Sequence, residues 1–178
     1  MPELAQVIGI VAMAANVLSF QFKKKNTVIF CQLIGATLFA VNMFMLGAMM
    51  GGLLNVIAFI RALVYINKDK LKIKDGFLCA FFMLLYAVSY VLVFTVFGKE
   101  PTPINFILEL VPLIGMAVMT VAFSGKSAKV IRVTGFFVTS PCWLIYDIVN
   151  FSLGGILCEA FSMVSAAVSY FRNDRKNN

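Results

Sequence analysis

The chain has 178 residues, of which 61% are hydrophobic and 13% charged, with no histidine and a net charge of +7. A soluble domain is about 45–50% apolar and about 25% charged, and a chain this short still exposes much of its surface. The composition therefore excludes a water-soluble fold and predicts an all-α integral membrane protein. Because each span needs about 20 apolar residues, the length allows up to about seven spans.

Composition also limits the chemistry that the chain can perform. There is no histidine to act as a base or metal ligand, and no serine lies in a glycine-rich nucleophile turn. We therefore expect no enzyme activity, no metal site and no cofactor. No arginine-rich face with exposed aromatics occurs, so we expect no nucleic-acid partner. Four cysteines stand singly in apolar runs and are expected to be free, namely Cys31, Cys79, Cys142 and Cys158.

The first apolar run extends from Leu4 to Phe22 and ends at three lysines. A cleavable secretory signal needs a basic segment before its apolar core, and no lysine or arginine precedes residue 23. The run is therefore expected to be a retained first span.

The next apolar stretch, from Thr27 to Asn67, is too long for one span. As a single helix it would be about 60 Å long at about 1.5 Å per residue, twice the thickness of the hydrocarbon core. It must fold back once, and the glycines Gly47, Gly51 and Gly52 predict where, since glycine tolerates turn conformations. This gives spans two and three.

The second half of the chain predicts four more spans. Span four covers Phe77 to Phe97, and span five covers about Ile104 to Phe123. The stretch from Val133 to Phe171 is again too long for one helix. It is expected to turn near Asn150 and the glycines at 154 and 155, which gives spans six and seven.

The basic residues indicate the orientation of the spans. When the loops are numbered alternately, 13 of the 15 lysines and arginines fall on one side. Only Lys99 falls on the other side, and Arg61 lies within span three. Because cytoplasmic loops are enriched in basic residues, we expect the N-terminus outside and the C-terminus in the cytoplasm. The residues on the basic side are Lys23, Lys24, Lys25, Lys68, Lys70, Lys72, Lys74, Lys126, Lys129, Arg132, Arg172, Arg175 and Lys176.

Spans one to three and spans five to seven share a pattern. A shift of 103 residues pairs Lys23 with Lys126 and Gly51 with Gly154, so the basic loop and the paired glycines coincide. Both triplets would enter the membrane from outside, which predicts parallel repeats related by an axis along the membrane normal. Span four then inverts the chain between them.

We therefore predict seven transmembrane helices arranged as two parallel three-helix bundles joined by an inverting linker helix, a 3+1+3 architecture. The first bundle covers residues 1–67, a loop and the linker helix cover 68–98, and the second bundle with a basic cytoplasmic tail covers 99–178. One chain holds both bundles, so a monomer or a homodimer could form a complete pathway.

Several segments resemble the YgjV-type family of bacterial inner membrane proteins, within the SWEET-like (PQ-loop) group. They are LAQVIGIVA at the start, ELVPLIG opening span five, and SPCWLIYD and GGILCEAF in spans six and seven. The resemblance implies the 3+1+3 fold, a multi-pass location in the bacterial inner (cytoplasmic) membrane and a small-molecule transport role. Trp143 and Tyr146 are similar to an aromatic pair of this group, and Asn55 is similar to its third-helix asparagine.

Ionisable side chains within spans are costly and therefore indicate function. Glu109, Asp147 and Glu159 should all lie roughly 5–9 Å below the outer ends of their helices. We expect Glu159, with Glu109 or Asp147, to bind a cationic or amine-bearing solute or to couple transport to protons. The alternative is that Glu109 and Asp147 simply face water at the headgroup boundary. At the shift of 103, the counterparts of the three acids in the first bundle are Gln6, Phe44 and Val56.

Five further residues are candidates for the pathway or for its hinge. Arg61 lies about six residues from the inner end of its span, where it could snorkel to the interface, form a gate or pair with a carboxylate. Trp143, Tyr146 and Asn55 suit a binding site at mid-depth, the alternative for the aromatics being an interfacial belt or helix packing. Pro112 should kink span five and could serve as a hinge.

The sequence thus predicts a small-molecule transporter with alternating access. No nucleotide-binding loop occurs, so ATP is not expected to drive it directly. The alternative is a membrane receptor or accessory protein that binds a ligand or partner without translocating it, since fold alone does not fix function. The expected partners are the lipid bilayer and a small-molecule solute of unknown identity.

Overall fold

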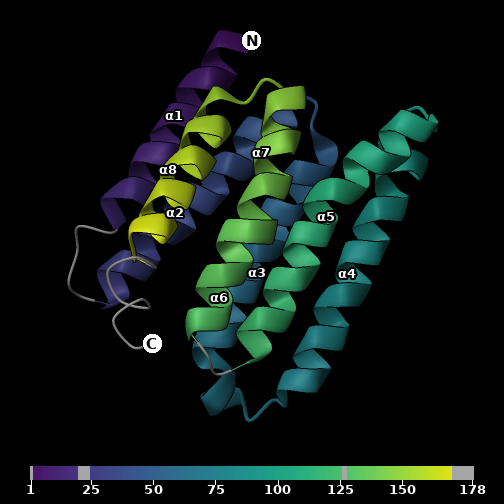
Figure 1. Cartoon of the computed structure of the whole chain (residues 1–178). Coiled ribbons are helices and arrows are strands. Elements are labelled where there is room, and N and C mark those ends of the chain that lie inside the picture. The colour runs from purple at the N-terminus through teal and green to yellow at the C-terminus, as the bar shows by residue number, and fades with distance from the viewer. Residues whose placement is uncertain (1, 20–24, 126–127, 170–178) are drawn as a thin grey trace.

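The computed structural model describes residues 2–19, 25–125 and 128–169, and every regular element among them is helical (Figure 1). Since α6, η1 and α7 follow one another without a break, these residues form seven helical rods. The elements are α1 (Pro2–Ser19), α2 (Lys25–Met45), α3 (Met49–Leu71), α4 (Asp75–Thr95), α5 (Pro103–Ser124), α6 (Ala128–Thr134), the π-helical η1 (Gly135–Thr139), α7 (Ser140–Val149) and α8 (Leu153–Ser169).

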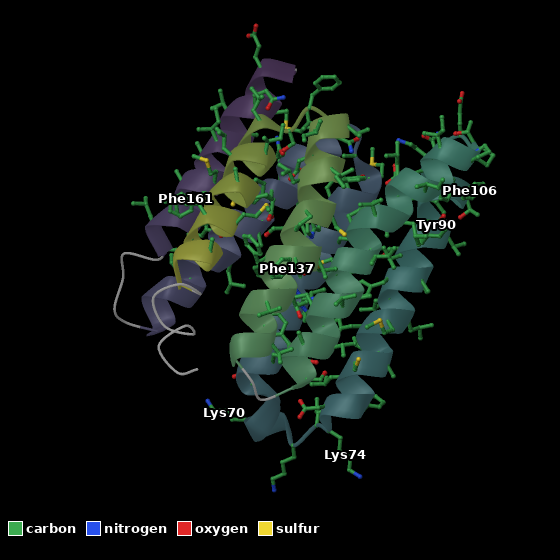
Figure 2. All side chains as sticks on the ribbon, viewed as in Figure 1. Lys70, Lys74, Tyr90, Phe106, Phe137 and Phe161 are labelled. Atoms are coloured by element: carbon green, nitrogen blue, oxygen red, sulfur yellow. The ribbon has the colours of Figure 1, made fainter. Side chains whose placement is uncertain are left out.

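Successive rods run in opposite directions, so α1 begins at one end of the bundle and α8 runs toward the other (Figure 1). Lys70 and Lys74 both lie at the end opposite to the start of α1 (Figure 2). The predicted end of the first span at Phe22, the end of the seventh at Phe171 and part of the predicted basic side lie outside the described residues. That part comprises Lys23, Lys24, Lys126, Arg172, Arg175 and Lys176.

Two of the rods, α4 and α5, are long and apolar enough to cross a membrane, by length and composition. The described parts of the others contain shorter apolar helices of 10–17 residues. The prediction of an all-helical chain with seven rods is confirmed for the described residues. Span four is observed at Asp75–Thr95 and span five at Pro103–Ser124, each within two residues of the predicted bounds.

The turns lie before the paired glycines, not at them. The chain reverses between α2 and α3 at Gly47, whose φ of 78° is in the left-handed region, and it reverses between α7 and α8 at Phe151, with φ 53°. Gly51 and Gly52 lie inside α3, and Gly154 and Gly155 lie inside α8. The part of the prediction that used these four glycines as turn residues is therefore wrong.

Several polar side chains are buried, and many large apolar side chains are exposed. Asn42 and Thr120 are fully buried, and Glu109 is only 2% exposed. By contrast, Ile107 is 65% and Phe137 69% exposed (Figure 2). Lipid solvates such a surface well and water does not, because apolar area in contact with water is unfavourable. The exposure pattern therefore agrees with a membrane location.

Six of the rods form a closed ring. Contacts join α1 to α2 and α8, α2 to α3, α3 to α5, α5 to α7, and α7 to α8. The rod α4 packs outside this ring against α3 and α5, at one edge of the molecule (Figure 1). Its buried side chains Phe82, Tyr86 and Val93 join the hydrophobic core that Met50 and Met116 also form.

Candidate functional site: a cavity inside the helix ring

A cavity of about 270 Å³ lies within the ring. Residues from α1, α2, α3, α5, η1, α7 and α8 line it, so every rod of the ring contributes. The polar residues of its wall include Asn16, Asn55, Ser140, Asp147, Glu159 and Ser162.

Two of the three predicted carboxylates meet in this cavity. Asp147 of α7 is 2% exposed, and Glu159 of α8 is half-buried. They are close enough to repel each other electrostatically, and the Ser140 hydroxyl hydrogen-bonds the Glu159 carboxylate. Among the described residues, the buried Oδ1 atom of Asp147 has no hydrogen-bond partner. A buried carboxylate oxygen without a donor is costly, so a cationic or hydrogen-donating ligand that reached this carboxylate would stabilise it.

The absence of a side chain at Gly155 makes room for the Asp147 carboxylate. The carboxylate packs directly on the α-carbon of Gly155, where an added Cβ would lie 2.6 Å from Oδ2. Real Cβ atoms do not approach a neighbour so closely, so any larger residue at 155 would displace the carboxylate. This contact explains why α8 has a glycine here.

Aromatic and amide side chains complete the wall. Trp143 of α7 and Phe39 of α2 both line the cavity. Asn55 also lines it, and its amide donates to the Gly51 carbonyl at 2.9 Å. Asn16 lines it from α1, and its Nδ2 lies 4.0 Å from the sulfur of Cys158. Sequence reasoning missed Asn16, although an amide inside an apolar run is itself a signal.

Glu109 is separate from this cavity. Its Oε1 pairs with Lys99 Nζ at 3.1 Å, and its Oε2 accepts a hydrogen bond from the Tyr146 hydroxyl at 3.0 Å. The Tyr146 hydroxyl also accepts a hydrogen bond from the Gly51 amide at 3.1 Å. The expected group of three acids is therefore divided into a pair in the cavity and one acid, Glu109, that forms an ion pair outside it. Tyr146 is the hydrogen-bond partner of Glu109, and its ring stands edge-on to that of Trp143 at 6.2 Å between centroids.

Arg61 is buried between α3, α4 and α5 rather than extended to the interface. Its Nη1 donates to the Thr120 hydroxyl at 2.7 Å, to the Tyr86 hydroxyl at 3.2 Å and to the Met116 carbonyl at 3.3 Å. Its guanidinium carbon lies 5.1 Å from the centroid of the Phe123 ring. No carboxylate pairs with it among the described residues, so the arrangement matches neither the predicted snorkelling nor the predicted ion pair.

The hinge candidate Pro112 is buried inside α5, which continues across it as one helix. An irregularity that was not predicted occurs in another rod. The π-helical segment η1 interrupts the rod that the sequence predicts as span six, and the Thr139 hydroxyl donates to the Gly115 carbonyl at 3.2 Å. Such segments are frequent at functional sites, and Gly135 and Thr139 both line the cavity.

The turn before α3, in the half of the ring formed by α1 to α3, matches the turn before α8, in the half formed by α5 to α8, at a spacing of 104 residues. The Ala48 amide donates to the Met43 carbonyl at 2.9 Å, and the Ser152 amide donates to the Asp147 carbonyl at the same distance. The predicted spacing of 103 is therefore one residue too short at this turn. With the observed spacing, the counterparts of Glu109, Asp147 and Glu159 are Ala5, Met43 and Asn55.

Side-chain hydrogen bonds follow the same spacing. Asn42 donates to the Ala5 carbonyl at 2.7 Å, as its counterpart Tyr146 donates to Glu109. Asn42 also accepts a hydrogen bond from the Ser152 hydroxyl at 2.9 Å. Each residue thus links its own half of the ring to the other half. Asn42 bonds to Ser152 at the start of α8, and Tyr146 bonds to Gly51 at the start of α3.

The acids and cysteines of the described residues do not form a ligand set for a metal ion. The described part of the chain contains no group of three or more histidine, cysteine, aspartate or glutamate side chains that could hold one.

Comparison with known proteins agrees with a membrane location. The family described as Imp-YgjV, bacterial inner membrane protein, matches residues 3–177. No curated protein and no solved structure matches the chain. Since the match covers nearly the whole sequence, the chain belongs to the Imp-YgjV family of bacterial inner membrane proteins.

Proposed function

We propose that this protein is a small-molecule transporter of SWEET-like fold that works by alternating access without ATP. The observation that carries the proposal is the cavity inside the ring, because it combines a polar wall with two carboxylates in a protein whose outer surface is apolar. Intramembrane carboxylates that face a cavity mark solute, ion or proton pathways. The solute is cationic or bears an amine, or else its movement is coupled to protons at Asp147 and Glu159.

The contacts of the ring support a two-bundle architecture. When each rod of the triplet α1, α2, α3 is exchanged with its counterpart in the triplet α5, α7, α8, every contact of the ring maps onto another contact. The contact of α1 with α8 becomes that of α5 with α3. This agrees with two parallel bundles related by an axis along the membrane normal, between which transporters of this kind bind their solutes. In this proposal α4 is the linker of a 3+1+3 fold.

Two hydrogen bonds between the halves of the ring, from Ser152 to Asn42 and from Gly51 to Tyr146, support access from one side at a time. Asn42 and Tyr146 hold the two halves together near the end of the bundle at which α1 begins (Figure 1). The cavity wall continues from Asp147 toward the other end, where Gly135 and Ser162 contribute. We propose that this other end, which also has the lysines at 70 and 74, faces the cytoplasm.

Uptake by proteoliposomes tests the proposal. Liposomes with the wild-type protein are supplied with a mixed metabolite pool, with and without a proton gradient, and their contents are analysed by mass spectrometry. We expect enrichment of one class of solute, and its loss in Glu159→Gln. The matched control is Glu100→Gln, which removes an exposed carboxylate outside the cavity. Specific binding without enrichment, from folded protein, would instead establish a receptor or accessory protein.

A further inference from the structure

The charges around the cavity are one-sided. Its described lining residues include two carboxylates, Asp147 and Glu159, and no lysine or arginine. Two basic side chains that the ring helices bind are already engaged, since the buried Arg61 donates to Thr120 and the half-buried Lys99 pairs with Glu109. A ligand with a carboxylate would therefore meet two like charges without a compensating cation.

The strongest anchor for a ligand is the Asp147 carboxylate. Asp147 lines the cavity, and its buried Oδ1 has no donor among the described residues. Glu159 has less need of a hydrogen-bond donor from a ligand, because the Ser140 hydroxyl already donates to it. An ammonium group supplies up to three donors and the opposite charge, which would satisfy Oδ1 and relieve the repulsion between the two acids.

The side chains that α2 contributes to the wall, Phe39 and Met43, are apolar. At the spacing of 104 residues, Phe39 and Met43 of the first half occupy the positions that Trp143 and Asp147 occupy in the second half. A ligand would thus have its charge against α7 and its body between Phe39 and Trp143. Aromatic faces bind flat apolar groups and also attract cations.

The size of the cavity restricts that body. Its volume of about 270 Å³ lies just below the range of about 300–1,000 Å³ that is usual for ligand sites. One ring with a short side chain suits this space better than a larger solute.

We propose that the site selects a small aromatic amine without a carboxylate, with its ammonium group at Asp147 and its ring between Phe39 and Trp143. The inference rests on the proposed function in taking this cavity as the solute site, and it adds the class of solute. Gly155 is a specificity-determining residue in this arrangement, because it sets the position of the Asp147 carboxylate.

Binding of three matched probes to the full chain in lipid nanodiscs tests the proposal by calorimetry. The probes are 2-phenylethylamine, the neutral 2-phenylethanol and the zwitterion phenylalanine. A hydrogen bond to a charged group contributes about 1.5–3 kcal/mol, so we expect the amine to bind about 10- to 100-fold more tightly than the alcohol. Phenylalanine should bind no better than the alcohol. Equal affinities of amine and alcohol, or preference for phenylalanine, would overturn the proposal without any variant.

Two variants then assign the anchor. Asp147→Asn should abolish the preference for the amine over the alcohol, and Gly155→Ala, which keeps the charge but moves it, should reduce it about tenfold. Glu100→Gln, which removes an exposed carboxylate, should leave the preference unchanged. If folded Asp147→Asn retained the full preference, the assignment to Asp147 would be wrong.

Flux measurements separate this inference from the proposed function. Binding of the amine without its uptake by proteoliposomes would refute transport and support the amine site. Uptake of a neutral or anionic solute, together with failure of the amine to bind, would refute the amine site and support transport.

Discussion

The hydroxyl of Tyr146 stabilises a carboxylate that the membrane would otherwise penalise. Tyr146 is 1% exposed, and its oxygen accepts the Gly51 amide while it donates to Glu109. The other oxygen of Glu109 pairs with Lys99. Burial of a charge is unfavourable unless it is paired and hydrogen-bonded, and here both oxygens of the carboxylate are satisfied. We therefore interpret Glu109 as structural.

This interpretation predicts the effect of Tyr146→Phe. The change leaves the Gly51 amide without its acceptor and Glu109 without one donor, both in a buried place. Leaving a buried group unsatisfied costs about 1–3 kcal/mol, so the free energy of unfolding in detergent should fall by about that amount. The control is Tyr90→Phe, which removes a more exposed hydroxyl that donates to the Phe106 carbonyl. An equal loss in the two variants would contradict the structural role of Glu109.

Sequence reasoning finds the residues of the cavity better than their partners. Asp147, Glu159 and Asn55 stand out because each is polar in an apolar run, and the cost of a polar group in lipid gives that signal physical meaning. The partner of Glu109 gives no such signal, because Lys99 lies in a loop between α4 and α5, where a lysine is ordinary. Which carboxylates face the cavity depends on how the helices rotate and pack, which hydropathy does not specify.

Glycine has the same ambiguity at the level of elements. It permits a turn, and it also permits two segments of the chain to approach closely. Gly47 takes the first role. Gly51 takes the second, since a Cβ there would lie 2.7 Å from the Tyr146 ring. The number of helical rods among the described residues could be predicted from hydropathy and length, whereas the role of each glycine depends on a contact with a distant helix.

The crossing of α1 and α8 provides a test of this second role. A Cβ on Gly154 would overlap the backbone of Gly9, so Gly154→Ala must push α8 away from α1. Overpacking typically costs about 1–3 kcal/mol, and we expect at least that loss in the free energy of unfolding. Gly76→Ala is the control, because nothing lies within 4 Å of its Cβ position in α4. Alanine there should be neutral or stabilise by up to about 1 kcal/mol. Equal free energies of unfolding for Gly154→Ala and Gly76→Ala would contradict the close contact between α1 and α8.

The whole molecule combines an apolar exterior with a ring of rods that have different walls. The first half of the ring presents Phe39 and Met43 to the cavity, and the second half presents Trp143 and Asp147. A structural repeat with unlike halves can hold an asymmetric solute in one orientation, which identical halves could not do. The asymmetry of charge within the cavity is separate from the asymmetry of basic residues between the two ends of the molecule. Our proposed orientation in the membrane rests on the second.

That orientation predicts which residues are reached from each side. Glu100 lies in the loop before α5, and Lys70 lies near the end of α3, at the opposite end of the bundle (Figure 2). In a variant with the four native cysteines replaced by alanine, Glu100→Cys should react with a membrane-impermeant maleimide in spheroplasts. Lys70→Cys should react only after the membrane is permeabilised, because cytoplasmic loops are the basic ones. Reaction of both cysteines in intact spheroplasts would contradict the placement of α4 as a span, because α4 alone separates residue 70 from residue 100. The reverse pattern of labelling would keep the ring but invert it in the membrane, and the cavity would then open to the outside.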